Sequence, residues 1–235
     1  MKEREIDEVL VRAAKDAPGV SPALLESIAG SIKPLMHPVR PMLSSWLLTA
    51  GLIVMAAAIA LAGAARAGLS GIEQLTIFER MVIFPVLVLL LWASAAEFAA
   101  SMIPGSRRRM RPGVLLAISC LALVGVFAAV FRDYHTTHFV SAGIACLVAG
   151  LVHAIPVALL SWLFLRRGFA VKPVAAGAVA GTLAGLAGVT MLELHCSNFQ
   201  VLHVLAWHTA VVPVAGAAGA SLARALQSRG SSTVR

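Results

Sequence analysis

Six long apolar runs constrain this 235-residue chain more than any other feature of its sequence. A run of about 20 apolar residues is long enough to cross the hydrocarbon core of a bilayer. Charged residues make up 13% of the chain, against about 25% in soluble domains, which fits the same interpretation. The runs cover residues 44–65, 81–103, 113–131, 141–165, 173–194 and 201–223. The sequence therefore predicts an all-α fold, a six-helix transmembrane bundle with a short N-terminal helical region.

The placement of arginine and lysine predicts the orientation of these runs, because cytoplasmic loops are enriched in both. The first, third and fifth loops between the runs hold only Arg66, Arg80 and Arg132. The remaining segments and the C-terminal tail hold Arg107, Arg108, Arg109, Arg111, Arg166, Arg167, Lys172, Arg224, Arg229 and Arg235. We expect residues 1–43 to be a cytoplasmic amphipathic region, 44–223 the membrane domain and 224–235 a cytoplasmic tail. This bias also accounts for the basic stretch at 107–111, so no direct nucleic-acid partner is expected.

The N-terminal region has a helical apolar stripe. It is formed by Ile6, Val9, Leu10 and Ala13, whose spacing is that of one helix face. Ser21–Pro22 is typical of the start of a second short helix. Two such helices cannot form a core, so they must pack on the membrane, on the bundle or on a partner. Acidic and basic residues balance here, whereas membrane-surface helices are usually rich in Lys and Arg, which favours a protein partner.

Small residues mark the fifth run, where Gly177, Gly181 and Gly185 recur every four residues. This pattern lets a neighbouring helix approach closely in a membrane. We therefore expect the fifth run to be a central packing element of the bundle.

Two cysteines lie at the outer ends of predicted spans: Cys146 begins the fourth run and Cys196 follows the fifth. On an oxidising side of a membrane, a thiol pair can form a disulfide or bind a soft metal ion. The alternative is that both are small packing residues, as is expected for Cys120 in the middle of the third run. The pair is therefore a hypothesis for sensing, either redox or metal.

Histidines accompany the cysteines. His195, His203 and His208 are possible accessory ligands for a transient heavy-metal ion, and no other cofactor is expected. His135 and His138 lie in another outer loop. No spacing matches a known metal motif, and His203 and His208 are five residues apart. On a regular α-helix they would point about 140° apart.

Three further ionisable residues lie in or near the predicted spans: Glu97, His153 and Glu193. Such groups are costly in a bilayer, so an ion or proton path is a hypothesis. Glu193, however, is predicted at the outer rim, where water would solvate it. These ionisable residues make a small-solute or ion transporter the alternative function. A thiol oxidoreductase that uses the outer cysteines is a more distant alternative. Enzyme motifs are absent from the sequence, so no enzyme is expected.

The last 90 residues carry four sequence marks. They are the cysteine that opens the fourth run, the inner loop LRRG…KP, the glycine-rich fifth run and the outer hairpin HC…H…WH. Together with IDEVLVRAAKDAP…PVRP near the N-terminus, they resemble the NrsF-type membrane proteins, negative regulators of sigma factor F. The resemblance implies an anti-sigma factor in the bacterial inner membrane. Such a protein would hold an extracytoplasmic-function sigma factor and release it under periplasmic stress, heavy metal or oxidant. It also implies that Cys146 and Cys196 sense the stress and that the N-terminal stripe binds the sigma factor.

Overall fold

The computed structural model describes residue 23 and residues 44–103, 106, 109–167 and 172–232 of the chain. The predicted partner-binding stripe of Ile6, Val9, Leu10 and Ala13 lies outside the described residues. Within the described ranges the secondary structure is helical, apart from one isolated bridge between Asp133 and Gln200.

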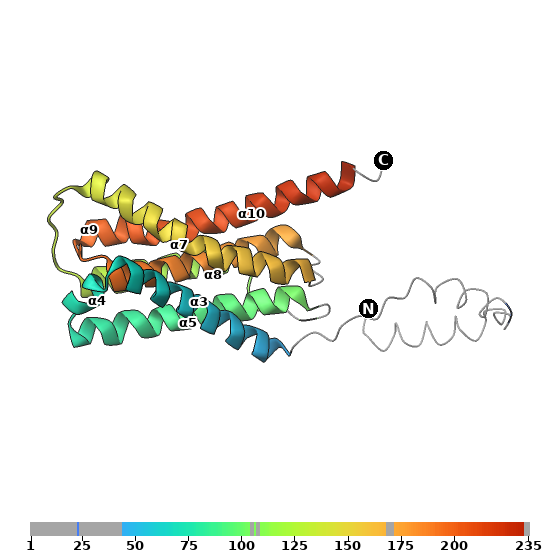
Figure 1. Ribbon diagram of the computed structural model, residues 1–235, viewed down its shortest axis with the longest axis horizontal. Helices are drawn as coiled ribbons and strands as arrows, with labels where there is room; N and C mark the ends of the chain where they lie inside the picture. Colours follow the sequence, from blue (N-terminus) through green and yellow to red (C-terminus); the bar gives the residue numbers. More distant parts are fainter. Residues whose placement is uncertain (1–22, 24–43, 104–105, 107–108, 168–171, 233–235) are drawn as a thin grey trace, which may run out of the picture. The chain divides into compact units, whose positions relative to one another are not determined.

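Six helical segments are long and apolar enough to cross a membrane, which confirms the predicted all-α architecture (Figure 1). They are α3 (Ser45–Ala67), α5 (Ile77–Met102), α6 (Pro112–Val130), α7 (Phe139–Arg167), α8 (Pro173–His195) and a last span in three parts. That span joins α9 (Val201–His203), the π-helical turn η2 (Val204–His208) and α10 (Thr209–Ser232). A short helix, α4 (Ser70–Gln74), lies between α3 and α5.

Local sequence signals explain where several helices begin. The Thr76 side chain accepts a hydrogen bond from the backbone N–H of Glu79, and the Glu79 carboxylate accepts one from the N–H of Thr76. This reciprocal capping box begins α5. Pro112 and Pro173 occupy the first turns of α6 and α8, where a missing N–H costs nothing. At its C-terminal end, α10 continues past residue 223, the predicted end of its span, because the following Leu, Ala, Arg and Gln residues favour helix.

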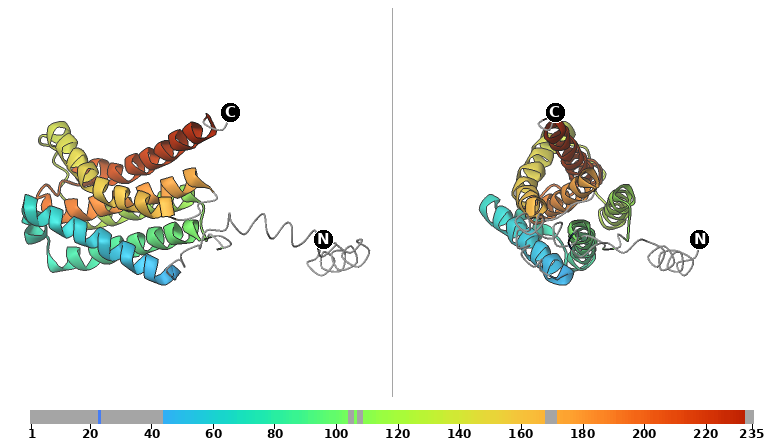
Figure 2. Two further views of the ribbon diagram at one scale, coloured as in Figure 1. Left: turned by 45° about the vertical axis from the view of Figure 1, so that its right-hand side comes forward. Right: turned by 90° about the vertical axis from the view of Figure 1, so that its right-hand side faces the viewer.

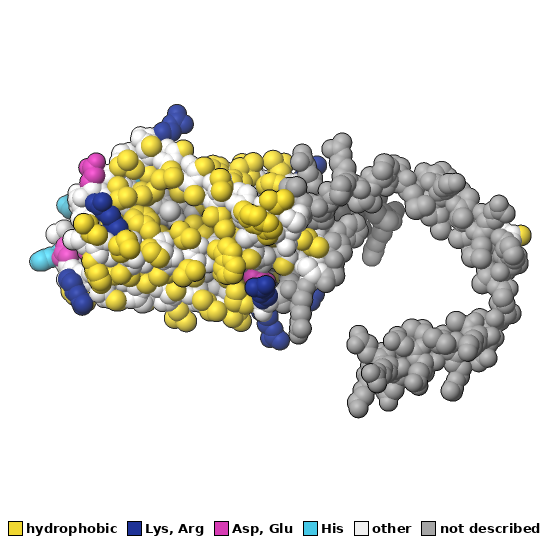
Figure 3. All heavy atoms as spheres, turned by 90° about the horizontal axis from the view of Figure 1, so that it is seen from below, with side chains coloured by type: hydrophobic (Ala, Val, Ile, Leu, Met, Phe, Trp, Pro, Cys, Tyr) yellow, Lys and Arg dark blue, Asp and Glu magenta, His cyan; other side chains and the backbone are white. Residues whose placement is uncertain are grey.

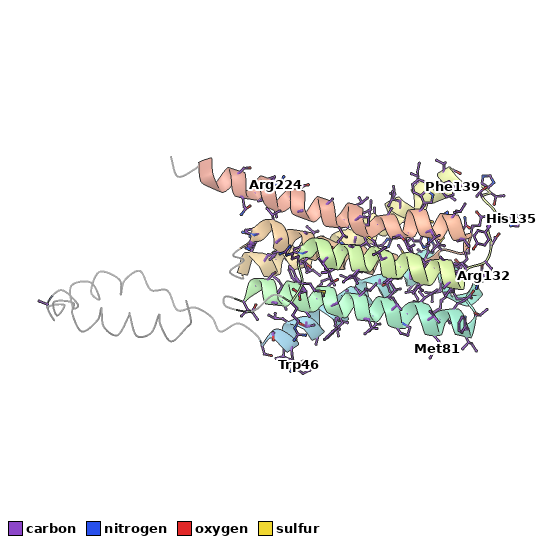
Figure 4. All side chains as sticks on the ribbon, turned by 180° about the vertical axis from the view of Figure 1, so that it is seen from behind. Trp46, Met81, Arg132, His135, Phe139 and Arg224 are labelled. Atoms are coloured by element: carbon purple, nitrogen blue, oxygen red, sulfur yellow. The ribbon has the colours of Figure 1, made fainter. Side chains whose placement is uncertain are left out.

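The connections divide between the two ends of the bundle. We call the end that carries segments 68–76, 131–138 and 196–200 the thiol end, and the end at which α3, α6 and α8 begin the tail end. Residues labelled in Figure 4 mark both ends, with Met81, Arg132, His135 and Phe139 at the thiol end and Trp46 and Arg224 toward the tail end. Hydrophobic side chains cover the middle of the face in Figure 3, and charged side chains gather at its ends. This distribution is typical of a protein whose belt contacts lipid.

Helix α8 is the central element of the bundle. In the apolar 18-residue stretch of α8, 78% is buried within the protein, against 22–50% in the corresponding stretches of the other five spans. It packs against α7 and α10, which group with it in the end-on view of Figure 2, and also against α3 and α5. A Cβ atom at Gly177 would lie 2.5 Å from the carbonyl oxygen of Gly219, and one at Gly181 would overlap the carbonyl of Ala215. The glycine face thus lets α8 and α10 touch through their backbones, as the spacing of Gly177, Gly181 and Gly185 predicted.

Candidate thiol and histidine site

Cys146 and Cys196 meet at the thiol end, with their Sγ atoms 3.4 Å apart. Cys146 lies on α7, and Cys196 directly follows the last residue of α8. The same face of α7 carries Gly143 and Gly150, and a Cβ atom at either would collide with side chains of the last span, including the indole of Trp207. Small residues therefore bring α7 close to its neighbours and turn Cys146 toward Cys196.

His203 and His208 also lie together, with ring centroids 5.3 Å apart. The expectation that they point about 140° apart is therefore wrong. The reason is the π-helical turn Val204–His208, in which the N–H of Thr209 bonds to the carbonyl of Val204, five residues back. Bonding from i to i+5 widens the turn, so residues five apart come to the same side of the helix.

The two thiols and the two imidazoles form one group, which we call the Cys2His2 cluster: Cys146, Cys196, His203 and His208. One potential ligand atom from each of the four residues lies within 4.8 Å of every other. The Sγ atom of Cys196 is 3.8 Å from Nε2 of His203. Both histidines are fully buried, Cys196 is 7% exposed and Cys146 is half-buried. The contact with Cys146 and burial both raise the pKa of Cys196, although the two imidazoles lower it in part, so the neutral thiol is favoured.

Glu193 orients one of these histidines. Its Oε1 atom is 2.7 Å from Nδ1 of His208, and both side chains have no exposed surface. Glu193 is therefore not solvated at the rim, in contrast to the sequence expectation. It lies on α8 one turn before Cys196, a spacing that places its side chain on the face that packs against the last span. The carboxylate accepts the Nδ1 proton of His208, which leaves Nε2 as the ring nitrogen open to a ligand.

The other histidines of the thiol end lie outside the cluster. The Nδ1 atom of His195 donates to the carbonyl of Gly68 at 3.0 Å, and its own carbonyl accepts from the Ser70 hydroxyl, so His195 fastens the segment before α4. His135 is exposed and its ring lies 2.6 Å from Asp133. The backbone N–H and the ring of His135 lower the pKa of Asp133. Of the three proposed accessory ligands, the structure brings His203 and His208 to the cysteines and leaves His195 apart.

The connecting segments of the thiol end contact one another beside the cluster. A Cβ atom at Gly71 of α4 would lie 2.8 Å from the carbonyl oxygen of Cys196, so α4 rests directly on the end of α8. The rings of Phe131 and Phe199 stack with centroids 5.1 Å apart, and Gln200 donates to the Thr137 hydroxyl at 2.7 Å. These contacts tie the three connections to one another at the end of the bundle that holds the cluster.

Glu97 and His153, the other two residues considered for an ion path, have local partners. The Oε1 atom of Glu97 accepts the backbone N–H groups of Arg109 and Met110 at 3.1 and 3.2 Å, and so fastens the segment before α6. The Nδ1 atom of His153 donates to the carbonyl of Ala149 at 2.8 Å. These bonds give Glu97 and His153 structural roles and add no support to the ion-path hypothesis.

The sequence contains no direct signal for Glu193 as a partner of His208, because the two are 15 residues apart and on different helices. The one indication in the sequence is energetic, because a carboxylate near membrane depth is costly unless it has a partner. Cys120, as expected, packs against the apolar core and is not part of the cluster.

A family model described as "negative regulator of sigma F" (NrsF) matches residues 28–227. The matched range contains every predicted span and all four residues of the Cys2His2 cluster, and begins after the stripe of Ile6, Val9, Leu10 and Ala13. Searches of curated proteins and of solved structures found no match.

Proposed function

Because this chain belongs to the NrsF family of negative regulators of sigma F, we propose that it is a membrane-bound anti-sigma factor for an extracytoplasmic-function sigma factor. The proposal places it in the bacterial inner membrane with both termini in the cytoplasm. The arginine and lysine distribution supports this orientation, since ten basic residues lie in the tail-end segments and C-terminal region and three in the thiol-end segments. The thiol end then faces the periplasm.

The N-terminal region 1–43 is the proposed docking segment for the sigma factor. Its apolar stripe and balanced charge suit a helix that lies in a groove of a protein partner. Burial of Ile6, Val9 and Leu10 would contribute roughly 1.5–3 kcal/mol each to binding. The double variant Ile6→Asp with Leu10→Asp should therefore lose the sigma factor in a pull-down of the full-length chain, while membrane insertion stays normal.

A matched control for this variant is Glu8→Ala, because the helical spacing predicts that Glu8 faces away from the stripe, and it should keep the sigma factor. Retention of the sigma factor by the double variant at the wild-type level would contradict the assignment of the docking stripe.

The regulatory signal is proposed to act at Cys146 and Cys196. The observation that carries this step is the 3.4 Å distance between their Sγ atoms, which joins α7 to the end of α8. An oxidant or a soft metal ion can link the two sulfurs and so change how α7 packs on α8. Because α8 is in backbone contact with α10, and α7 and α10 both end at the tail end, the change reaches the cytoplasmic side. A bias of about 1–2 kcal/mol would shift a two-state bundle several-fold to about thirtyfold.

The test is sigma-dependent transcription in cells that carry Cys146→Ser, Cys196→Ser or Cys120→Ser as the sole copy. We expect the first two variants to lose induction by an oxidant or a thiol-reactive metal. The Cys120→Ser variant controls for loss of a thiol elsewhere in the bundle and should respond normally. Full induction in all three variants would show that the cysteine pair is only a packing feature.

A further inference from the structure

The structure holds more than a cysteine pair at the thiol end, because both sulfurs share one pocket with two buried imidazoles. We infer that Cys146, Cys196, His203 and His208 form a closed four-ligand site for a divalent ion of the zinc group, with Glu193 as the outer partner that orients His208. This inference deepens the proposed function by naming the ligand set, and rests on that function only for its consequence in the cell.

The geometry matches tetrahedral coordination. With Zn–S bonds near 2.3 Å and Zn–N bonds near 2.0–2.1 Å, a tetrahedron separates two sulfurs by about 3.8 Å and a sulfur from a nitrogen by about 3.6 Å. The Sγ–Sγ distance here is 3.4 Å and the distance from Cys196 Sγ to His203 Nε2 is 3.8 Å, so each lies within about 0.4 Å of the tetrahedral separation for its pair of atoms. All four ligand atoms fall within 4.8 Å of one another, so an ion at their centre needs only small side-chain adjustments.

One unpartnered nitrogen in the cluster points to a missing ligand. Nε2 of His208 is buried and has no hydrogen-bond partner among the described residues. A buried polar atom without a partner is costly, so its presence calls for an explanation. Coordination of an ion supplies one, because Glu193 already holds Nδ1 and leaves Nε2 for the metal. A carboxylate behind a ligating histidine is the usual outer arrangement of metal sites, where it fixes the tautomer and raises the basicity of the ring.

The charges and the composition of the cluster select the ion. Binding replaces the two thiol protons: the ion forms two metal–thiolate bonds, and two protons leave to solvent. Two thiolates then balance a divalent ion, and the two imidazoles add no charge. Two sulfur and two nitrogen ligands in a tetrahedron favour zinc or cadmium over magnesium or calcium, which take oxygen ligands. Four protein ligands leave no open position, which is typical of a structural or sensory site rather than a catalytic one.

Cobalt(II) is the probe that reports this geometry. The purified full-length chain, kept reduced with a non-thiol reductant, is titrated with Co2+ and then with Zn2+ or Cd2+ as competitor. We expect one equivalent of Co2+ to give thiolate-to-cobalt charge transfer and the intense visible absorption of a tetrahedral ion. A wild-type chain without this tetrahedral signal would overturn the inference, whatever the variants do.

Variants then assign the ligands. His203→Ala and His208→Ala should abolish the tetrahedral spectrum, whereas His195→Ala, a matched control whose ring is bonded to Gly68, should keep it. Glu193→Gln preserves size and an acceptor atom and should weaken zinc affinity about 10–100-fold. Circular dichroism and elution as a single species confirm that each variant is folded. Wild-type affinity and spectrum in both histidine variants would refute the four-ligand site.

The sigma factor is absent from this titration, so the site and the proposed function can fail separately. If the wild-type chain binds Co2+ in a tetrahedral site but its cysteine variants regulate transcription normally, the metal site is supported and the sensing role is refuted. If regulation depends on the cysteines but the wild-type chain shows no tetrahedral Co2+ spectrum, the four-ligand site is refuted and a redox signal at the cysteine pair is supported.

Discussion

Oxidation should cross-link Cys146 to Cys196 and leave Cys120 free. The two Sγ atoms lie 3.4 Å apart, and a disulfide requires about 2.05 Å, so the sulfurs must approach by about 1.4 Å. We expect rotation of the two side chains to supply a movement of this size. Cys120 is a free thiol on α6 and has no part in the cluster.

The size of the stabilisation follows from the loop that the bond closes. Cys146 and Cys196 are 50 residues apart, and the chain-entropy estimate for such a loop is about 4 kcal/mol. In a bilayer the spans are already confined, so most of this entropy has been lost before the bond forms. We therefore expect about 1–2 kcal/mol of added resistance to unfolding, well below the estimate for a soluble chain.

The assay counts thiols and then measures unfolding. Polyethylene glycol maleimide in denaturant should label three cysteines of the reduced chain and one of the chain treated with a mild oxidant, since Cys146 and Cys196 are then joined. Unfolding by sodium dodecyl sulfate in mixed micelles should shift to higher detergent in the oxidised chain, and not in the Cys196→Ser variant. Three labelled thiols after oxidation, at a dose that oxidises a model dithiol fully, would refute the proximity on which the account depends.

Three other predictions follow from the packing and the orientation. Gly181→Leu should separate α8 from α10 and lower the free energy of unfolding in mixed micelles by at least about 1–3 kcal/mol. Gly51→Leu should be neutral, because a Cβ atom at Gly51 would meet nothing within 4 Å. Equal effects of the two substitutions would contradict the backbone contact. Glu97→Ala should leave two backbone N–H groups unpaired, cost about 1–3 kcal/mol and increase proteolysis between α5 and α6, while Glu97→Gln should cost less. Reporter fusions at residue 108 should be cytoplasmic and fusions at residue 136 periplasmic; the reverse pattern would move the cluster to the cytoplasm.

The spans and their packing could be predicted from the sequence, because both depend on local composition. Hydropathy identifies a span residue by residue, and the four-residue repeat of Gly177, Gly181 and Gly185 identifies a close helix contact without reference to its partner. The meeting of Cys146 with Cys196 could be proposed from topology alone, since alternate helix ends share one side of the bundle. That reasoning places two residues at one depth and does not give a distance.

The histidine pair could not be predicted, because it depends on a departure from regular helix. Periodicity arguments assume i to i+4 bonding, and the single π-helical turn at Val204–His208 reverses their outcome for His203 and His208. Burial of Glu193 likewise depends on a partner from another helix and on α4, which packs over the end of α8. Its sequence position at the end of a span indicates only that water could be near.

The most direct test of the account is release of the sigma factor from the reconstituted full-length protein. The chain is placed in liposomes with its thiol end outward, the cognate sigma factor is bound to the tail-end side, and Cd2+ is added outside. We expect the bound fraction of sigma factor to fall in wild type and in Cys120→Ser, and to stay constant in Cys146→Ser and Cys196→Ser. A sigma factor that never binds, or one that is released equally from all four proteins, would contradict the central claim that the thiol end controls an anti-sigma factor.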